Sequence, residues 1–186
     1  HADTFNFELY VKGKPIIVDT GISTYEKNSR RQFERSTEAH NTIRIDGMDS
    51  SEVWGGFRVA KRAKIISLHE SEDTIEATHD GYKNIGAYHT RSFSKAKKLF
   101  VIKDRIESNK AHQIESFIHF HPDCKVSIKG ASIEVGTDFK IDIVNSKKIV
   151  LEEYDYSLGF NKTKKAKKIR AFVGRNSRIE ISKEEI

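Results

Sequence analysis

Short runs in which apolar and polar residues alternate dominate the sequence. In the first run, Phe5, Phe7 and Leu9 fall on one face of an extended chain, and the residues between them fall on the other. About a dozen such runs follow at spacings of roughly 8 to 12 residues, which is typical of a sandwich or a barrel. They occupy residues 5–11, 16–18, 42–46, 63–69, 74–79, 98–106, 113–121, 125–128, 132–135, 139–144, 148–154, 169–173 and 178–181. No segment keeps a helical period over three turns, so the pattern predicts an all-β chain.

The size and composition fit one domain. The chain has 186 residues, of which 37% are hydrophobic. This is enough to bury a core without disulfide bonds. Only two prolines and no low-complexity linker occur, so we expect residues 1–186 to form a single domain. Residues 155–168, with Gly159 and many lysines, are expected to form a long hairpin loop.

Two kinds of structure are excluded. The apolar runs are much shorter than the roughly 20 residues that a membrane-spanning helix needs, so no membrane span is expected. Cys124 is the only cysteine, which excludes an internal disulfide and a multi-cysteine zinc cluster.

The chain is basic, with 33 Lys and Arg against 27 Asp and Glu and a net charge of +6. The densest cluster of cations consists of Lys162, Lys164, Lys165, Lys167, Lys168 and Arg170. Such a cluster can bind a polyanion, either a nucleic acid or an acidic glycan. No aromatic residue is interleaved with these cations, so base stacking has no support and we expect no nucleic-acid partner. A solvated loop is the simpler interpretation of the cluster.

The first quarter of the chain contains residues that suit a metal ion. His1, Asp3, Asp19 and His40 lie in or near predicted strands. Two imidazoles and one carboxylate suit zinc and leave a fourth position for another group. Spacing alone favours a simpler interpretation, in which His1 is a solvated terminal residue, Asp19 belongs to a turn and His40 is hydrogen-bonded near a loop.

Three ordered motifs carry a resemblance. They are HAD at 1–3, VDTG at 18–21 and RSTEAHNT at 35–42, followed by Ile45, Asp46 and Gly47. Together they resemble the heparinase II/III family, and specifically its C-terminal β-sandwich domain, over the whole chain. The resemblance implies a two-sheet antiparallel β-sandwich of the supersandwich type without a substantial helix. It also implies a Zn²⁺ site formed by His1, Asp19 and His40, with a structural role.

The resemblance also implies a function for the longer protein. In that family an α/α toroid precedes the sandwich, and the groove between them cleaves uronic-acid polysaccharides by β-elimination. The catalytic tyrosine and histidines of the family precede the position matched by His1, so we expect no catalytic residue in this chain and no activity from it alone. The chain begins with His1 and no initiator Met, which we interpret as a C-terminal piece of a longer protein, periplasmic or secreted. The alternative is a non-catalytic module that binds acidic glycans.

Four residues in or after the motifs are candidates for substrate contact. They are Tyr25, Arg35, Asn41 and Trp54. Arginine binds carboxylates with two parallel hydrogen bonds, and aromatic rings stack on sugars, so both suit a uronate polymer. For Trp54 a ring packed beside Gly55 and Gly56 is an equal alternative. The family commonly has an aromatic residue at the position of Ser23, and this departure affects substrate identity.

Other histidines are weaker candidates. His119 and His121 project from the same face of a predicted strand, but the alternation around them fits an ordinary strand. His79, His89 and Arg91 flank a predicted turn at 80–82, and polar strand edges are the favoured interpretation over a groove.

Overall fold

The computed structural model describes residues 1–96, 99–136 and 138–183 and confirms the all-β fold. The strands are β1 (Leu9–Val11), β2 (Lys14–Ile17), β3 (Ile43–Ile45), β4 (Val53–Trp54), β5 (Arg58–Val59), β6 (Ile65–Glu70), β7 (Thr74–His79), β8 (Ala87–Ala96), β9 (Leu99–Ser108), β10 (Ile114–His119), β11 (Val126–Lys129), β12 (Ser132–Val135), β13 (Phe139–Gly159) and β14 (Lys162–Lys183). The helical elements are α1 (Ser29–Arg35) and two 3-10 turns, η1 (Thr37–Ala39) and η2 (Lys83–Ile85). Within the described residues, no helix has the length and apolar character needed to cross a membrane.

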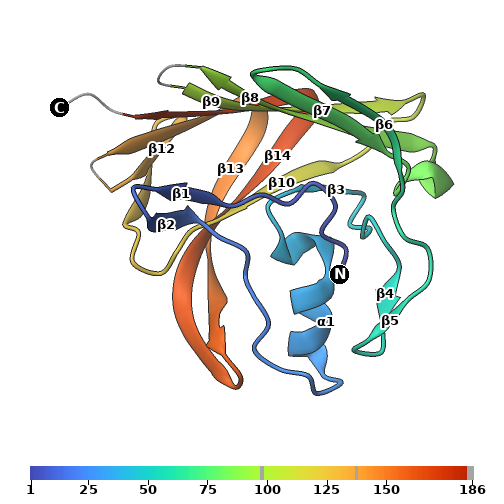
Figure 1. Cartoon of the computed structure of the whole chain (residues 1–186), viewed down its shortest axis with the longest axis horizontal. Coiled ribbons are helices and arrows are strands. Elements are labelled where there is room, and N and C mark those ends of the chain that lie inside the picture. The colour runs from blue at the N-terminus through green and yellow to red at the C-terminus, as the bar shows by residue number, and fades with distance from the viewer. Residues whose placement is uncertain (97–98, 137, 184–186) are drawn as a thin grey trace.

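The strands form two layers that share β13 and β14 (Figure 1). One layer continues from β14 through β9, β8, β7 and β6, and the other joins β10 and β3 to β14. Along β14, residues from Lys168 to Val173 pair with β10, whereas residues from Asn176 to Ser182 pair with β9. These pairings are antiparallel, so the predicted two-sheet antiparallel sandwich is confirmed.

Gly174 lies where β14 passes from one layer to the other. A Cβ atom at this position would lie 2.5 Å from Nδ2 of Asn145 on β13. The pairing of β13 with β14 shifts register between Val144 and Lys148, at the same level. An irregular segment in one strand and a glycine in its partner allow both strands to bend together.

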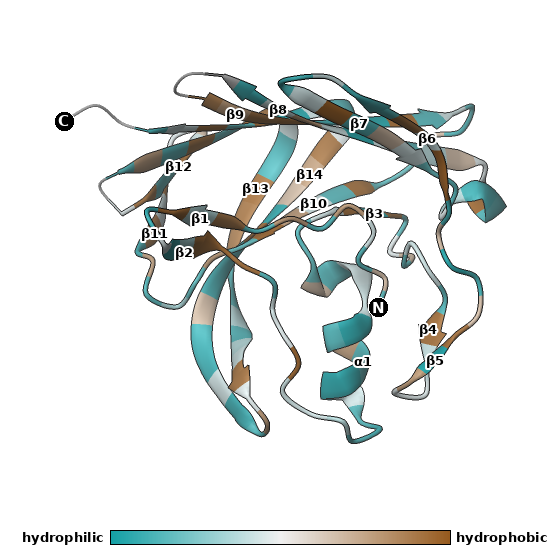
Figure 2. Cartoon of the chain, in the orientation of Figure 1, coloured by the Kyte–Doolittle hydropathy of each residue, from teal (hydrophilic) through white to brown (hydrophobic). Residues whose placement is uncertain are grey.

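Branched aliphatic side chains fill the space between the layers. Ile118 on β10 and Ile169 on β14 face each other, and both are fully buried. Further members of this core are Ile17, Ile43, Ile45, Ile102, Ile133, Ile141 and Ile179. In Figure 2 hydrophobic residues recur along the strands of both layers, as the alternating sequence predicts.

Residues 155–168 form a hairpin as expected, but the prediction of a long loop in this segment is wrong. β13 extends to Gly159 and β14 begins at Lys162, so this segment is a long regular hairpin with a short turn. The lysines lie opposite acidic residues of β13: Lys167 pairs with Glu153 and Lys165 with Asp155. Cross-strand pairs of opposite charge support a strand, which the composition of the segment alone does not reveal.

The N-terminal part is less regular than its pattern predicts. Phe5 has a φ of 67°, in the left-handed region, so the chain turns before β1 begins at Leu9. α1 begins after Asn28, whose side chain accepts a hydrogen bond from the N–H of Arg31. It spans seven residues, and in the part of the chain that the structure describes no longer helix occurs, in agreement with the expectation of no substantial helix.

Candidate metal centre and the surface around it

Backbone hydrogen bonds fix the N-terminal segment beside the loop that contains His40. The N–H of Ala2 donates to the carbonyl of Arg35 at 2.9 Å, and the hydroxyl of Thr37 donates to the carbonyl of Ala2 at 3.0 Å. Ala2 is fully buried by these contacts. Its neighbours His1 and Asp3 are therefore positioned next to His40.

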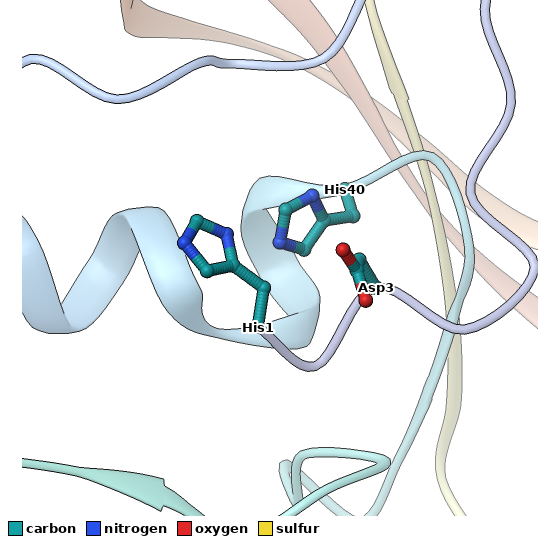
Figure 3. A group of neighbouring side chains, drawn as sticks. All are labelled: His1, Asp3 and His40. Atoms are coloured by element: carbon teal, nitrogen blue, oxygen red, sulfur yellow. The ribbon is translucent and has the colours of Figure 1, made fainter. Parts of the chain in front are cut away.

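His1, Asp3 and His40 form a cluster that can hold a metal ion (Figure 3). One ligand atom of each residue lies within 4.8 Å of the others. The imidazole rings of His1 and His40 are 5.5 Å apart between centroids. His40 is buried and Asp3 is exposed, so the cluster lies at the surface with one ligand on the interior side.

Asp19 binds the same histidine from its other side. Its Oδ2 lies 2.6 Å from Nδ1 of His40 and accepts a hydrogen bond from Asn6, while Oδ1 accepts one from the N–H of Gly21. Burial opposes ionisation of Asp19, but the hydrogen bond and charge of His40 outweigh it, so the pKa of Asp19 lies below its ordinary value. An ionised carboxylate only accepts, so Nδ1 of His40 carries the proton.

Either ring nitrogen of His40 can bind a metal. Nε2 is buried and has no hydrogen-bond partner among the described residues. A histidine that donates Nδ1–H to a carboxylate and leaves Nε2 free has the tautomer and orientation of a metal ligand. The predicted residues His1, Asp19 and His40 lie close together, with Asp19 at Nδ1 of His40, and Asp3 is a second carboxylate nearby. An ion at Nε2 would not reach Asp19, whereas an ion held by both Asp19 and His40 would replace the proton on Nδ1. Two imidazoles with a carboxylate fit zinc.

Arg35 is not at the surface. Its side chain is buried, and its two terminal nitrogens donate to the carbonyls of Trp54 and Arg58 at 3.1 and 2.9 Å. The guanidinium therefore fixes the hairpin of β4 and β5 to α1, and substrate contact by this side chain would require that hairpin to move.

Asn41 is fully buried, and both the amide nitrogen and the amide oxygen of its side chain have hydrogen-bond partners. Its Nδ2 donates to the carbonyls of Phe7 and Val18, and its Oδ1 accepts from the backbone N–H of His119 at 2.7 Å. Its own carbonyl accepts from Arg91 at 2.7 Å. Asn41 therefore joins several chain segments beneath the metal cluster and presents no exposed surface to a ligand.

Tyr25 and Trp54 are exposed, unlike the other two candidates. The exposed fractions of these residues are 57% for Tyr25 and 43% for Trp54. Tyr25 lies in the loop before α1 and Trp54 lies in β4, and β4 runs near α1 and the N-terminus (Figure 1). They remain candidates for substrate contact.

His119 supports Asn41 and is not part of the cluster. It is fully buried, its ring packs on Tyr154 at 4.9 Å, and burial together with nearby Lys168 holds its pKa well below the ordinary value. His121 lies beyond the end of β10. Within the described residues, neither histidine belongs to a group of three ligands suited to a metal.

His79, His89 and Arg91 form a buried chain of hydrogen bonds, so neither strand edges nor a groove describes them. The N–H of Gly81 donates to Nδ1 of His79, Nε2 of His79 lies 3.1 Å from Nδ1 of His89, and Nε2 of His89 lies 2.6 Å from Oδ1 of Asp104. Arg91 binds both oxygens of Asp104. Burial lowers the pKa of His79 to about 3, so this ring stays neutral. The alternation that predicts the strands does not predict this network.

Two hollows lie next to the cluster. The smaller, of about 290 Å³, is lined by His1 and Asp3 together with Ser51 and Arg62. The larger, of about 470 Å³, shares Ser51 and Arg62. The larger hollow is lined by Lys61, Lys64 and Lys83 together with Asp49, Glu52 and Asp80. An open surface of mixed charge therefore extends away from the metal cluster.

Comparison with solved structures shows a shared fold. A heparan sulfate lyase HepC mutant from Pedobacter heparinus superposes with a TM-score of 0.76 at 18% identity, covering 100% of this chain and 31% of that one. The HepC heparan sulfate lyase of the same organism gives a TM-score of 0.75 at 18% identity, with the same coverage. A heparinase III, the BT4657 gene product, gives 0.75 at 17% identity, covering 99% of this chain and 30% of that one. The chain thus spans less than a third of these proteins.

Sequence comparison identifies the family. No curated protein matches the sequence. The family model described as heparinase II/III-like, C-terminal, matches residues 1–182. The chain belongs to the heparinase II/III-like C-terminal domain family.

Proposed function

We propose that this chain is the C-terminal sandwich of a polysaccharide lyase that cleaves uronic-acid-containing polysaccharides by β-elimination. The match to the family over residues 1–182 is the observation that carries the proposal. The solved relatives named heparan sulfate lyase and heparinase III support an acidic polysaccharide as substrate. Because the chain spans less than a third of their length, the proposal includes an upstream toroid. We propose separately, from the family resemblance, that the parent protein is periplasmic or secreted.

The chemistry of elimination accounts for the absence of a catalytic assignment here. The reaction requires neutralisation of the uronate carboxylate, a base that removes the adjacent proton and an acid that protonates the leaving oxygen. Histidine and tyrosine are suited to the last two roles, but His119 and Tyr154 are buried and His40 is bound by Asp19. The family resemblance locates the catalytic tyrosine and histidines in the upstream domain, so we assign proton transfer to that domain and substrate contact to exposed Tyr25 and Trp54.

Lyase activity is testable with the full-length protein. Incubation with heparan sulfate, alginate or hyaluronan is expected to release an unsaturated uronate, which is detected by its ultraviolet absorbance, and residues 1–186 alone are expected to release none. Absence of product from all three polymers with the full-length protein would contradict the proposal. Activity of residues 1–186 alone would contradict the upstream location of the catalytic residues.

We also propose a structural zinc ion held by His1, Asp19 and His40. Oδ2 of Asp19 and Nδ1 of His40 lie 2.6 Å apart, and a zinc ion held by both would take the place of the proton between them. Bound zinc supplies a cross-link between the N-terminal segment and the loop before β3. Asp19 is the less exposed of the two neighbouring carboxylates and is already fixed by Asn6, which favours it over Asp3.

Elemental analysis of protein purified without a chelator tests the zinc site. Wild type is expected to contain close to one zinc per chain, and His40→Ala and Asp19→Asn are expected to lose most of it. Asp3→Asn is the matched control and is expected to keep it. Equal zinc content in wild type and His40→Ala would remove the site, whereas loss in Asp3→Asn with retention in Asp19→Asn would transfer the carboxylate role to Asp3.

A non-catalytic module that binds acidic glycans is the second candidate, favoured by the net charge of +6. Binding of heparin, alginate or hyaluronan by residues 1–186 that weakens as salt rises would support it, because exposed charge contacts are screened. Product release by the full-length protein would exclude it.

A further inference from the structure

Three aromatic rings from separate segments meet at one end of the molecule. Tyr25 lies in the loop before α1, Phe57 in the turn between β4 and β5, and Phe160 at the tip of the β13–β14 hairpin. The ring of Tyr25 is 6.5 Å from that of Phe57 with planes 7° apart, and 6.3 Å from that of Phe160 with planes 19° apart. The exposed fractions of the three residues are 57%, 57% and 62% in this order. We call these three residues the aromatic platform.

The turn that presents Phe57 is fixed to α1. Arg31 donates from Nε to the carbonyl of Gly56 at 3.1 Å, and its guanidinium carbon lies 5.5 Å from the ring centroid of Tyr25 and 5.6 Å from that of Phe57. Gln32 donates to the carbonyl of Val53 at 2.8 Å. The helix α1 therefore holds the turn that carries Phe57, and its Arg31 contacts the rings of both Tyr25 and Phe57.

The hairpin that presents Phe160 is fixed to the loop of Tyr25. The N–H of Asn161 donates to the carbonyl of Ser23 at 2.6 Å, and the N–H of Ser157 donates to the carbonyl of Thr20 at 2.9 Å. The three rings are thus exposed although the segments that carry them are well anchored. A surface ordered in advance loses less conformational entropy when a ligand binds, which is an advantage for a binding site.

Each ring has a free cation close to it in the sequence. Lys27, Arg58 and Lys162 are all exposed. Among the described residues, no hydrogen bond or ion pair joins the charged group of any of the three to a partner. Lys27 also lies against the turn of Phe57, because a Cβ on Gly56 would lie 3.1 Å from its Cγ. Each ring of the aromatic platform therefore has an unpaired cation within two residues of it in the sequence, and Glu26 is the acidic neighbour of Tyr25.

We propose that the aromatic platform, with Lys27, Arg58 and Lys162, binds an acidic oligosaccharide. The C–H faces of sugar rings pack on aromatic faces, and the carboxylates or sulfates of the same chain pair with the surrounding cations. A neutral glycan satisfies only the rings, and a small anion satisfies only the cations. This inference rests on the proposed function for the chemistry of its ligand. It extends the proposed substrate contact of Tyr25 to Phe57 and Phe160, next to the metal cluster, because Arg31 also lies 3.4 Å from Nε2 of His1.

Single-stranded nucleic acid is the competing ligand, since bases also stack on aromatic rings beside cations. Membership in the heparinase II/III-like C-terminal family favours the saccharide. Binding of oligothymidylate is therefore included as an outcome of the test.

Titration calorimetry of the chain with a heparan sulfate octasaccharide tests the proposal. Tyr25→Ala, Phe57→Ala and Phe160→Ala are each expected to weaken binding about 5- to 10-fold, as expected for loss of one stacked ring. Lys27→Gln and Lys162→Gln are expected to weaken binding and to reduce its dependence on salt. The matched control is Tyr88→Ala, an exposed aromatic on β8 in the other layer, which is expected to leave binding unchanged. Circular dichroism confirms that each variant is folded.

Several results would overturn the proposal. They are no measurable binding by wild type, equal binding of neutral dextran, tighter binding of oligothymidylate, or an equal effect of Tyr88→Ala and the platform variants. These outcomes differ from failure of the proposed function, which the release of unsaturated uronate by the full-length protein reports. If the full-length protein releases unsaturated uronate but the platform variants bind the octasaccharide as tightly as wild type, only this inference is refuted.

Discussion

The Arg91–Asp104 pair is the most buried charge pair beneath the metal cluster. Both side chains are almost fully buried, and Arg91 donates to Oδ1 and Oδ2 of Asp104 at 2.7 and 2.9 Å. Arg91 also donates to the carbonyls of Phe5 and Asn41, so it fixes both segments that flank the cluster. Replacement of Asp104 by Asn keeps the shape of the side chain but leaves the Arg91 cation buried without a counter-charge.

The expected cost is large. Removal of one partner of a buried ion pair typically costs about 3–5 kcal/mol, because the remaining charge stays desolvated. In a domain of this size each kcal/mol lowers Tm by about 2–4 °C, so Asp104→Asn is expected to lower Tm by roughly 6–20 °C. Burial raises the pKa of Asp104, but Arg91 and His89 outweigh it, so the pKa lies below its ordinary value of 3.8. The stabilisation is therefore complete above about pH 4 and is lost as pH falls through the lower pKa of the folded state.

Urea denaturation and thermal melting at pH 7 measure this cost. Glu107→Gln on the same strand is the matched control, because Glu107 pairs with Arg105 at 2.8 Å while both side chains are about half exposed. Such an exposed pair contributes at most about 1 kcal/mol. If Asp104→Asn destabilises the protein no more than Glu107→Gln, the reasoning about a buried counter-charge is refuted.

Three further predictions concern other parts of the structure. Because the pKa of His79 is lowered from 6.5 to about 3, its contribution to stability is complete above pH 6.5 and is lost as pH falls toward 3; in His79→Gln, urea midpoints measured across this range are expected to depend less on pH. Gly174→Ala is expected to cost about 1–3 kcal/mol by crowding Asn145, and Asn145→Gly in the same chain is expected to recover part of this loss in a double-mutant cycle; additive costs would contradict the contact. If zinc is bound at 100 times its Kd, its removal by a chelator is expected to cost about 2.7 kcal/mol and to lower Tm by roughly 5–10 °C. The same treatment is expected to leave His40→Ala unchanged, and an equal shift in both proteins would contradict the zinc site.

Alternation predicts most of the fold because the two layers bury one face of each strand. Ile118 and Ile169 are typical, since their neighbours in sequence point away from the core. The same reasoning fails at 155–168, where Lys165 and Lys167 are stabilised by Asp155 and Glu153 of the facing strand. Register between distant segments decides such pairs, and a local composition of lysine and glycine does not contain it.

The motifs predict which residues matter near the site more successfully than they predict their roles. His1 and His40 meet as the motifs indicate, but spacing cannot show that Asp19 binds one nitrogen of His40 while Asp3 lies toward the other side. Arg35 is predicted for substrate contact because its charge suits uronates, yet it binds backbone carbonyls instead. Whether a polar side chain faces solvent or the backbone depends on tertiary packing.

The segment RSTEAHNT, residues 35–42, mainly holds other segments of the chain in place. Arg35, Thr37 and Asn41 all donate hydrogen bonds to backbone carbonyls of other segments and so position the metal cluster and the loops. Residues that can contact a saccharide, such as Phe57 and Phe160, lie outside the motifs on the tips of hairpins. Under the proposed function, substitutions at these tips are expected to change which acidic polysaccharide is bound, while residues 35–42 keep the same supporting structure. Exchange of the hairpin tips, without any change in residues 35–42, is therefore the expected route to altered substrate preference.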